Sequence, residues 1–164
     1  MVQRRPFPLL AQRPAVLDGV ILDFHWDPQR LHSLCLPERD VPTSTLEWHL
    51  TLPFWAADGK PFQVSPADVA AAPGEHPEQW NRTMAADLRY PLDAYVGSGS
   101  RLIILDGVHR LLKAVQEGRQ TLRMRVLTAE SFDAIVVPAS EGREGPGHDG
   151  RTPNAPVSAG DRGW

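Results

Sequence analysis

Five consecutive residues, Asp106-Gly107-Val108-His109-Arg110, bring an acid, a glycine, an imidazole and a guanidinium together. An apolar run at 102–105, after Arg101, precedes them, and an amphipathic stretch at 108–117 contains the last three. This order predicts a buried strand, a sharp turn and the start of a helix. The first N–H groups of a helix have no partner within it and point, with the positive end of its dipole, at one spot. Phosphate is a natural ligand of such a corner.

Each side chain of this turn has a structural and a functional interpretation. Gly107 forms a tight turn, or lets a phosphate approach the backbone. Asp106 caps the following helix, or orients an acceptor hydroxyl or holds Mg²⁺. His109 is a buried, hydrogen-bonded histidine, or a phosphate contact or proton-transfer group near neutral pH. Arg110 forms a salt bridge, or offers its planar fork to phosphate. Taken together, these residues favour phosphate binding at the turn.

Outside the turn, Glu47 is a candidate catalytic base. The same residue ends Ser44-Thr-Leu-Glu47, which matches a helix capping box, and that structural role alone explains it. A second group, consisting of His25, His32 and His49 with Asp23 and Asp27, contains metal-ligating side chains. Its spacings match no helical i, i+4 pair, and we assign no metal to it.

Composition limits the class of protein. The chain has 164 residues, a length sufficient for one hydrophobic core. Its formal charge of −3 gives no overall positive field that would attract nucleic acid. A single cysteine, Cys35, excludes an internal disulfide and a multi-cysteine zinc site. No apolar run is long enough for a signal peptide or a membrane span. These features predict a soluble, cytoplasmic protein.

Three segments are expected along the chain. Prolines interrupt the flexible N-terminus, residues 1–14. A single domain is predicted for residues 15–137. The remainder, residues 138–164, has almost no apolar content and is predicted to be disordered, because it cannot offset the entropy of ordering.

The elements predicted within the domain are short and of both types. Asp27 and Ser65 are expected to cap helices, and Thr121 to Leu127 alternates so that Leu122, Met124 and Val126 face the core while Arg123 and Arg125 face solvent. In chain order we predict one or two strands at 15–24, helices at 28–34, after Ser44, after Ser65 and at 77–88, a hairpin of 91–96 with 101–105, a helix at 108–117 and a strand at 121–127. The fold class is therefore α+β.

Residues 77–127 resemble the ParB/sulfiredoxin superfamily. The resemblance lies in a helix, a Pro-Leu-x-x-x-Val strand, a glycine-rich turn, Ile-Leu-Asp-Gly-Val-His-Arg-Leu-Leu-Lys-Ala, and an arginine-rich strand. Partition proteins of this superfamily continue into a helix-turn-helix region, which has no counterpart here. Sulfiredoxins have a catalytic cysteine where this chain has Val108. The free serine kinases are the most similar in motif, although they have a histidine at the position of Val108.

The resemblance implies a small mixed-sheet domain that acts as a nucleotide-binding enzyme and transfers phosphate to a small metabolite, a kinase-type transferase. It implies ATP, ADP or CTP, with Mg²⁺, as cofactor, and a small molecule rather than nucleic acid or membrane as substrate. The implied catalytic residues are Asp106, His109 and Glu47; nucleotide contacts come from Gly107, Val108, His109 and Arg110; and Asp106 holds the metal. The alternatives are a non-catalytic nucleotide-sensing module and a nucleic-acid-associated domain.

Overall fold

The computed structural model describes residues 3–142. These residues form a mixed four-stranded sheet, a separate two-stranded sheet and short helices, which confirms the predicted α+β class. Of the predicted disordered tail, residues 143–164 lie outside the described part. Pro138 pairs with Arg4, and Ala139–Gly142 form a 3₁₀ helix, η6.

The four-stranded sheet has the order β1-β6-β4-β5. The strands β1 and β6 are antiparallel, β6 and β4 are parallel, and β4 and β5 form an antiparallel hairpin. The second sheet pairs β2 with β3. The strands are β1 (Glu38–Pro42), β2 (Trp55–Ala57), β3 (Lys60–Val64), β4 (Leu92–Val96), β5 (Leu102–Asp106) and β6 (Thr121–Leu127).

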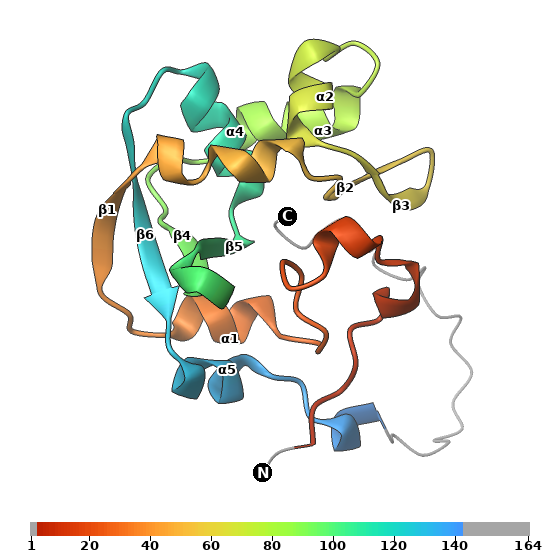
Figure 1. The fold of residues 1–164 in the computed structure, drawn as a ribbon, viewed down its shortest axis with the longest axis vertical. Coiled ribbons are helices and arrows are strands. Elements are labelled where there is room, and N and C mark those ends of the chain that lie inside the picture. The colour runs from red at the N-terminus through yellow and green to blue at the C-terminus, as the bar shows by residue number, and fades with distance from the viewer. Residues whose placement is uncertain (1–2, 143–164) are drawn as a thin grey trace, which may run out of the picture.

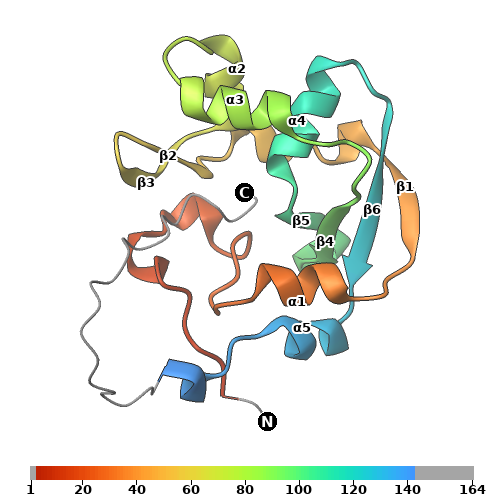
Figure 2. The ribbon, with the colours of Figure 1, turned by 180° about the vertical axis from the view of Figure 1, so that it is seen from behind.

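The helices gather at two ends of this sheet (Figures 1 and 2). Helices α2, α3 and α4 contact one another at one end, and α1 and α5 pair at the other. The α-helices are α1 (Pro28–Ser33), α2 (Pro66–Ala71), α3 (Pro77–Ala85), α4 (Val108–Gln116) and α5 (Ala129–Ile135). The 3₁₀ helices besides η6 are η1 (Leu10–Gln12), η2 (Ala15–Leu17), η3 (Thr43–Thr45), η4 (Glu47–Thr51) and η5 (Ser98–Ser100).

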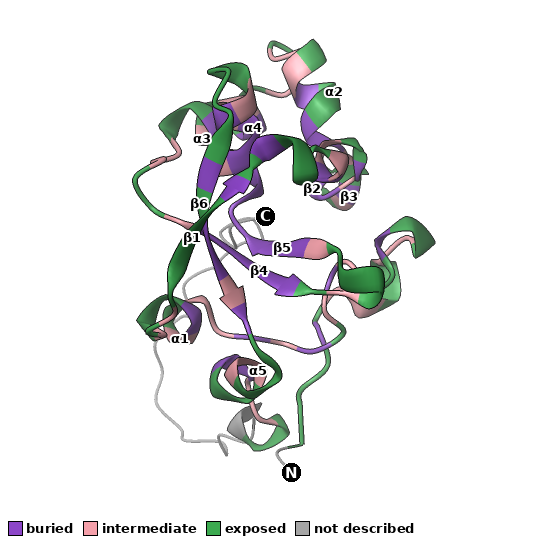
Figure 3. Cartoon of the chain, turned by 60° about the vertical axis from the view of Figure 1, so that its left-hand side comes forward, coloured by how far each residue is buried: buried purple, intermediate pink, exposed green. Residues whose placement is uncertain are grey.

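Both faces of the sheet are buried. Side chains alternate along a strand, so Ile104 packs with Leu111 of α4 in one cluster, while Ile103 and Leu105 pack with Leu31 of α1 in another. Figure 3 shows β4 and β5 mostly buried, and the edge strand β1 mostly exposed. The interior of the hairpin is therefore held from both sides, which fixes the turn that follows β5.

Several predicted helix starts are confirmed. The Asp27 carboxylate accepts hydrogen bonds from the N–H groups of Gln29 and Arg30 at the start of α1. Ser65 and Asp68 form a reciprocal capping box at the start of α2. In both helices proline occupies the first turn, where its missing N–H has no cost. The hairpin, α4 and β6 also lie where the sequence predicts them.

The N-terminal part differs from prediction. The prediction of strands at 15–24 is wrong: the segment is η2 followed by a turn in which Gly19 has a φ of 73°. The hydroxyl of Tyr95 on β4 donates to the carbonyls of Gly19 and Val20 and holds this turn against the sheet. Where we expected a flexible N-terminus, Phe7 is buried and its N–H donates to the carbonyl of Asp23. The strands β1, β2 and β3 and the helix α5 were not predicted.

Among the described residues, no helix combines the length and apolar character that crossing a membrane requires.

Candidate functional site

Gly107 forms the turn between β5 and α4. Its φ is 117°, which side chains rarely adopt, and a Cβ added there would lie 2.9 Å from Cγ of Leu92. Only glycine fits this position without strain. Gly107 is also the N-cap of α4, and no side chain caps the helix, so the interpretation of Asp106 as a cap is wrong. The first N–H groups of α4 thus have no capping side chain.

Asp106, at the end of β5, bonds instead to two basic groups. Its Oδ2 accepts from Nη2 of Arg110 at 3.0 Å and lies 3.1 Å from Nε2 of His32. Arg110 also donates to the carbonyl oxygen of Pro91. The structure therefore realises the salt-bridge interpretation of Arg110, and the guanidinium is fixed one helical turn beyond Asp106.

His109 points toward α3 and β2 rather than outward. Its ring stacks on Trp55 with centroids 4.2 Å apart, and its Nε2–H donates to Oε1 of Gln79 at 3.0 Å. Burial lowers the pKa of His109 to about 3, with the nearby positive charge of Arg82 adding to the effect. The ring is neutral at pH 7 and a weak base. The side chain of Val108 is buried in the core, so Val108 can contact a ligand through its backbone.

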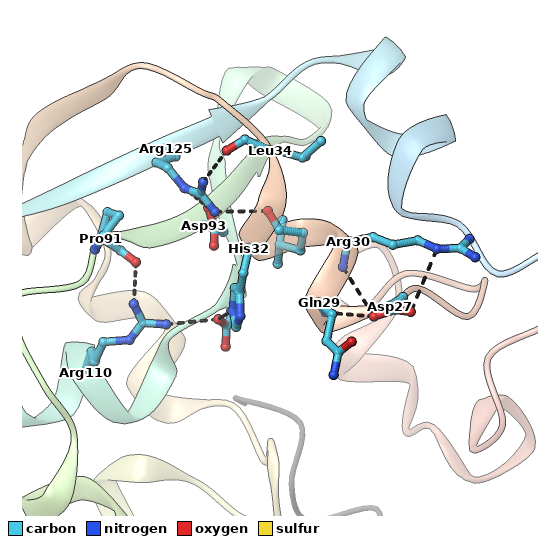
Figure 4. Close-up of polar contacts among 11 residues, drawn as sticks. Asp27, Gln29, Arg30, His32, Leu34, Pro91, Asp93, Arg110 and Arg125 are labelled. Carbon is cyan, nitrogen blue, oxygen red and sulfur yellow. Dashed lines mark hydrogen bonds and ion pairs between the residues drawn. The ribbon is translucent and has the colours of Figure 1, made fainter.

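A second acid, Asp93, lies opposite Asp106 in the hairpin register. It is 2% exposed and its Oδ1 accepts from Nε of Arg125 at 2.7 Å (Figure 4). Burial raises the pKa of Asp93, against the lowering effect of Arg125. The guanidinium of Arg125 also donates to the carbonyl oxygens of Leu31 and Leu34 at the end of α1. The predicted exposure of Arg125 is wrong, because α1 covers this face of β6, whereas Arg123 is exposed.

His32 approaches the two acids from α1. Its side chain is 59% exposed, and the hydrogen bond to Asp106 raises its pKa. Ligand atoms of His32, Asp93 and Asp106 all lie within 4.8 Å of one another, and these three form the one group of this kind found among the described residues. With the two arginines they make up what we call the charged cluster: His32, Asp93, Asp106, Arg110 and Arg125.

A cavity of about 540 Å³ opens beside the charged cluster. Its volume is in the usual range for small-molecule sites. Acids outnumber arginines in its wall, which favours a cationic ligand or an anion accompanied by a cation. The lining residues are His32, Glu38, Ala86, Asp87, Tyr90, Pro91, Asp93, Asp106, Gly107, His109, Arg110 and Arg125.

The predicted site residues are only partly brought together. Asp106, Gly107, His109 and Arg110 line the cavity, and Val108 lies between them in the chain. Glu47 is exposed on η4 and does not line it. The predicted capping box is also wrong: Leu46, not Ser44, precedes η4, and no side chain caps that helix.

Sequence reasoning missed Asp93, Arg125 and Glu38 as site residues. It grouped His32 with His25, His49, Asp23 and Asp27, whereas the structure brings His32 together with Asp93 and Asp106. A signal existed for Asp93, since it is a lone acid inside the apolar strand Leu92–Val96. Pairing that strand with 101–106 in a hairpin places Asp93 near Asp106. No local pattern marks His32 or Arg125, because their proximity depends on how α1 and β6 pack.

Comparisons with protein-family models, curated proteins and solved structures give no match to this chain. The resemblance to the ParB/sulfiredoxin superfamily thus stays a prediction.

Proposed function

We propose that the cavity binds the phosphates of a nucleotide at the Gly107 turn, and that the protein transfers phosphate to a small metabolite. The observation that carries the proposal is the position of the turn. Residues 106, 107, 109 and 110 form one wall of the cavity, where α4 begins without a capping side chain. Free N–H groups and the helix dipole both favour an anion there.

The neighbouring arginine supports phosphate binding. Arg110 lies in the same wall and is only 15% exposed, held by Asp106 and the carbonyl of Pro91. A guanidinium has five N–H donors, so it can keep one partner and still donate to a phosphate oxygen. Its position is fixed before the ligand arrives, which lowers the entropy lost on binding.

The carboxylates of Asp93 and Asp106 fit a divalent cation of the kind that accompanies nucleotides. Both are oxygen donors, both line the cavity, and they belong to paired strands. The cavity wall contains four acids, which repel phosphate, and a cation bound there would reduce this repulsion. In this proposal Asp106, beside the turn, orients the acceptor hydroxyl, whose oxygen bonds to the terminal phosphorus of ATP or CTP. The bond from that phosphorus to the bridging oxygen breaks, the nucleoside diphosphate leaves, and the hydroxyl proton passes to Asp93, whose pKa is raised by burial.

His109 and Glu47 take different roles from those expected. His109, neutral and stacked on Trp55, shapes the cavity wall and is too weak a base for proton transfer at neutral pH. Glu47 is left out of the proposed site. Tyr90, 64% exposed on the cavity wall, offers a flat face for the base of ATP, ADP or CTP. A cytoplasmic location, as the sequence predicts, would supply these nucleotides.

Thermal unfolding with nucleotide tests the proposal. ATP, ADP and CTP, each with Mg²⁺, are added to the full chain, and a nucleotide that binds raises the melting temperature. Free ligand at 100 times its Kd contributes about 2.7 kcal/mol. Glu47→Gln, an exposed change outside the cavity, should retain the full shift. If no nucleotide moves the wild-type transition, the proposal is wrong.

A second candidate, a nucleotide-sensing module without turnover, is favoured by one observation: each cavity aspartate is already paired with an arginine. This pairing reduces the charge available for catalysis. The two candidates differ in the turnover of the wild type, measured by phosphate release and compared with Asp106→Asn, while thermal shift checks that both proteins bind nucleotide. An enzyme loses turnover while keeping binding, whereas a sensing module binds nucleotide and shows no turnover even in the wild type.

A further inference from the structure

Three side chains from separate parts of the fold converge on one point beside the cavity. His32 comes from α1, Asp93 from β4 and Asp106 from β5. One ligand atom of each lies within 4.8 Å of the others. Figure 4 shows Asp93 and His32 drawn between the guanidinium groups of Arg125 and Arg110.

The spacing is close to that of a metal site. In octahedral coordination with bonds of about 2.1 Å, two adjacent ligands are about 3.0 Å apart and two opposite ligands about 4.2 Å apart. Nε2 of His32 and Oδ2 of Asp106 are already 3.1 Å apart. All three ligand atoms lie within 4.8 Å of one another, which is close to the span of two opposite ligands on one ion.

The arginines do not occupy all the carboxylate oxygen positions that could bind a metal. Arg125 engages Oδ1 of Asp93 through Nε, and Arg110 engages Oδ2 of Asp106. A carboxylate has two oxygens and about four acceptor positions, so each aspartate can hold its arginine and still bind a cation. Two more acids, Glu38 and Asp87, line the same cavity, and their arginine partners Arg123 and Arg89 do not. The cavity wall therefore has an excess of negative charge.

The burial of two facing acids is a separate observation. Asp93 and Asp106 are 2% and 5% exposed, and carboxylates so placed are costly unless positive charge accompanies them. Each of the two has one arginine partner, Arg125 for Asp93 and Arg110 for Asp106. A divalent cation among the three ligands would add positive charge at the point where the two acids face each other.

The donor set determines which cation fits. Two carboxylates alone suit Mg²⁺, but an imidazole nitrogen suits first-row transition metals and zinc. We infer that His32, Asp93 and Asp106 form a binding site for a divalent ion of the Mn²⁺ or Zn²⁺ type, which binds without nucleotide and in preference to Mg²⁺. The inference rests on the proposed function for the use of the metal, whereas binding of the metal itself is measured with no nucleotide present.

The test is a titration of the full chain with Mn²⁺ alone, followed by the loss of the free-ion electron paramagnetic resonance signal. Wild-type protein should bind one Mn²⁺ per chain, and His32→Ala should weaken binding at least tenfold, since one of three ligands is lost. His32→Asp restores a donor but makes the set all-oxygen, so it should narrow the preference for Mn²⁺ over Mg²⁺ in competition. His76→Ala, a histidine that does not line the cavity, is the matched control and should bind as wild type does.

His32 is largely exposed, so its variants should fold, and circular dichroism checks this. Wild-type protein that takes up no Mn²⁺ overturns the inference, and so does an unchanged affinity in His32→Ala. A zinc titration by calorimetry with the same variants gives a second measurement of the same prediction.

The outcomes also separate this inference from the proposed function. Mn²⁺ binding that depends on His32, with no nucleotide shift, retains the metal site and rejects phosphotransfer. The opposite result is a melting-temperature shift with nucleotide and Mg²⁺ that His32→Ala leaves unchanged, together with no Mn²⁺ binding when nucleotide is absent. That result retains the proposed nucleotide site and rejects the metal site.

Discussion

The charged cluster and the aromatic surroundings of His49 place the same kind of side chain in opposite states. His32 lies beside Asp106 and is half exposed, and its pKa is raised. His49 is fully buried, with its ring 3.8 Å from that of Trp48, and burial lowers its pKa to about 4. The neighbours, not the residue type, thus decide in which direction the pKa of each histidine moves.

The two histidines also do different work in the fold. In η4, Nδ1–H of His49 donates to the carbonyl of Leu46, and Nε2 accepts from the N–H of Ile104 on β5. Both nitrogens are used, so His49 fixes η4 to the sheet. His32 has Nε2 on Asp106 and borders the cavity, where it is accessible to ligands. The ring nitrogens of His49 are therefore both hydrogen-bonded within the protein, whereas the His32 side chain can contact a ligand in the cavity.

The largest expected effect is loss of a charge from the charged cluster. Asp93→Ala leaves Arg125 buried without its partner, and we expect the free energy of unfolding to fall by about 3–5 kcal/mol. Chemical denaturation measures it. The double variant Asp93→Leu with Arg125→Met, which removes both charges, should recover part of the loss. A fall below about 1 kcal/mol in Asp93→Ala would mean that the pair is not buried as described.

In the aromatic surroundings the expected loss is smaller. His49→Phe keeps the ring volume but leaves the N–H of Ile104 without an acceptor, at a cost of about 1–3 kcal/mol. His76→Phe, at the start of α3, is the control for adding a phenyl ring. Equal stability of the two variants would show that the hydrogen bonds of His49 contribute nothing.

The pH dependence sharpens the comparison. The usual histidine pKa is 6.5, and folded His49 takes up its proton only near 4. Between these values the unfolded state binds more protons, so the free energy of unfolding falls as the pH is lowered from 6.5 toward 4. His49→Phe should make this fall shallower by up to about 1.4 kcal/mol per pH unit. Unfolding curves at half-unit steps test it, and an unchanged slope contradicts it.

His32 should act in the opposite direction. Its raised pKa stabilises the fold fully below pH 6.5, and this contribution is lost as the pH rises through the folded value. Because the side chain is more than half exposed, we expect a small effect, below about 1 kcal/mol. His32→Ala should therefore lower stability at pH 5.5 more than at pH 8.5. Equal losses at both pH values would show that the pair with Asp106 is not ionic.

The smallest effect is expected at the exposed pair of Arg123 and Glu38, whose nitrogen and oxygen are 2.8 Å apart. Glu38→Gln should change the free energy of unfolding by less than about 0.5 kcal/mol, because solvent screens the charges. The contrast with Asp93→Ala tests whether burial sets the value of an ion pair here. Similar losses at the two sites would remove that distinction.

Local sequence patterns predicted several helix starts and the turn at Gly107 correctly. Asp27 and Ser65 cap helices as the sequence indicates, and Asp106 to Arg110 form a strand-to-helix turn. These features depend on residues a few positions apart, whose preferences act before any packing. The predictions of strands at 15–24 and of a cap at Ser44 are wrong. Local backbone hydrogen bonds form 3₁₀ turns in both segments, and burial of Leu17 and Leu46 in the core favours these turns.

The sequence by itself determined the glycine turn, since the left-handed backbone at Gly107 admits almost nothing else, and the short helices with their caps. Only the tertiary structure decided which acids share the cavity. Asp93 is 13 residues from Asp106 in the chain and His32 is 74, and they meet because the hairpin register pairs the strands and Arg125 ties β6 to the end of α1. The same packing buried His109 against Trp55 and made it neutral. Burial and the surrounding charges set ionisation, and the packed fold determines both.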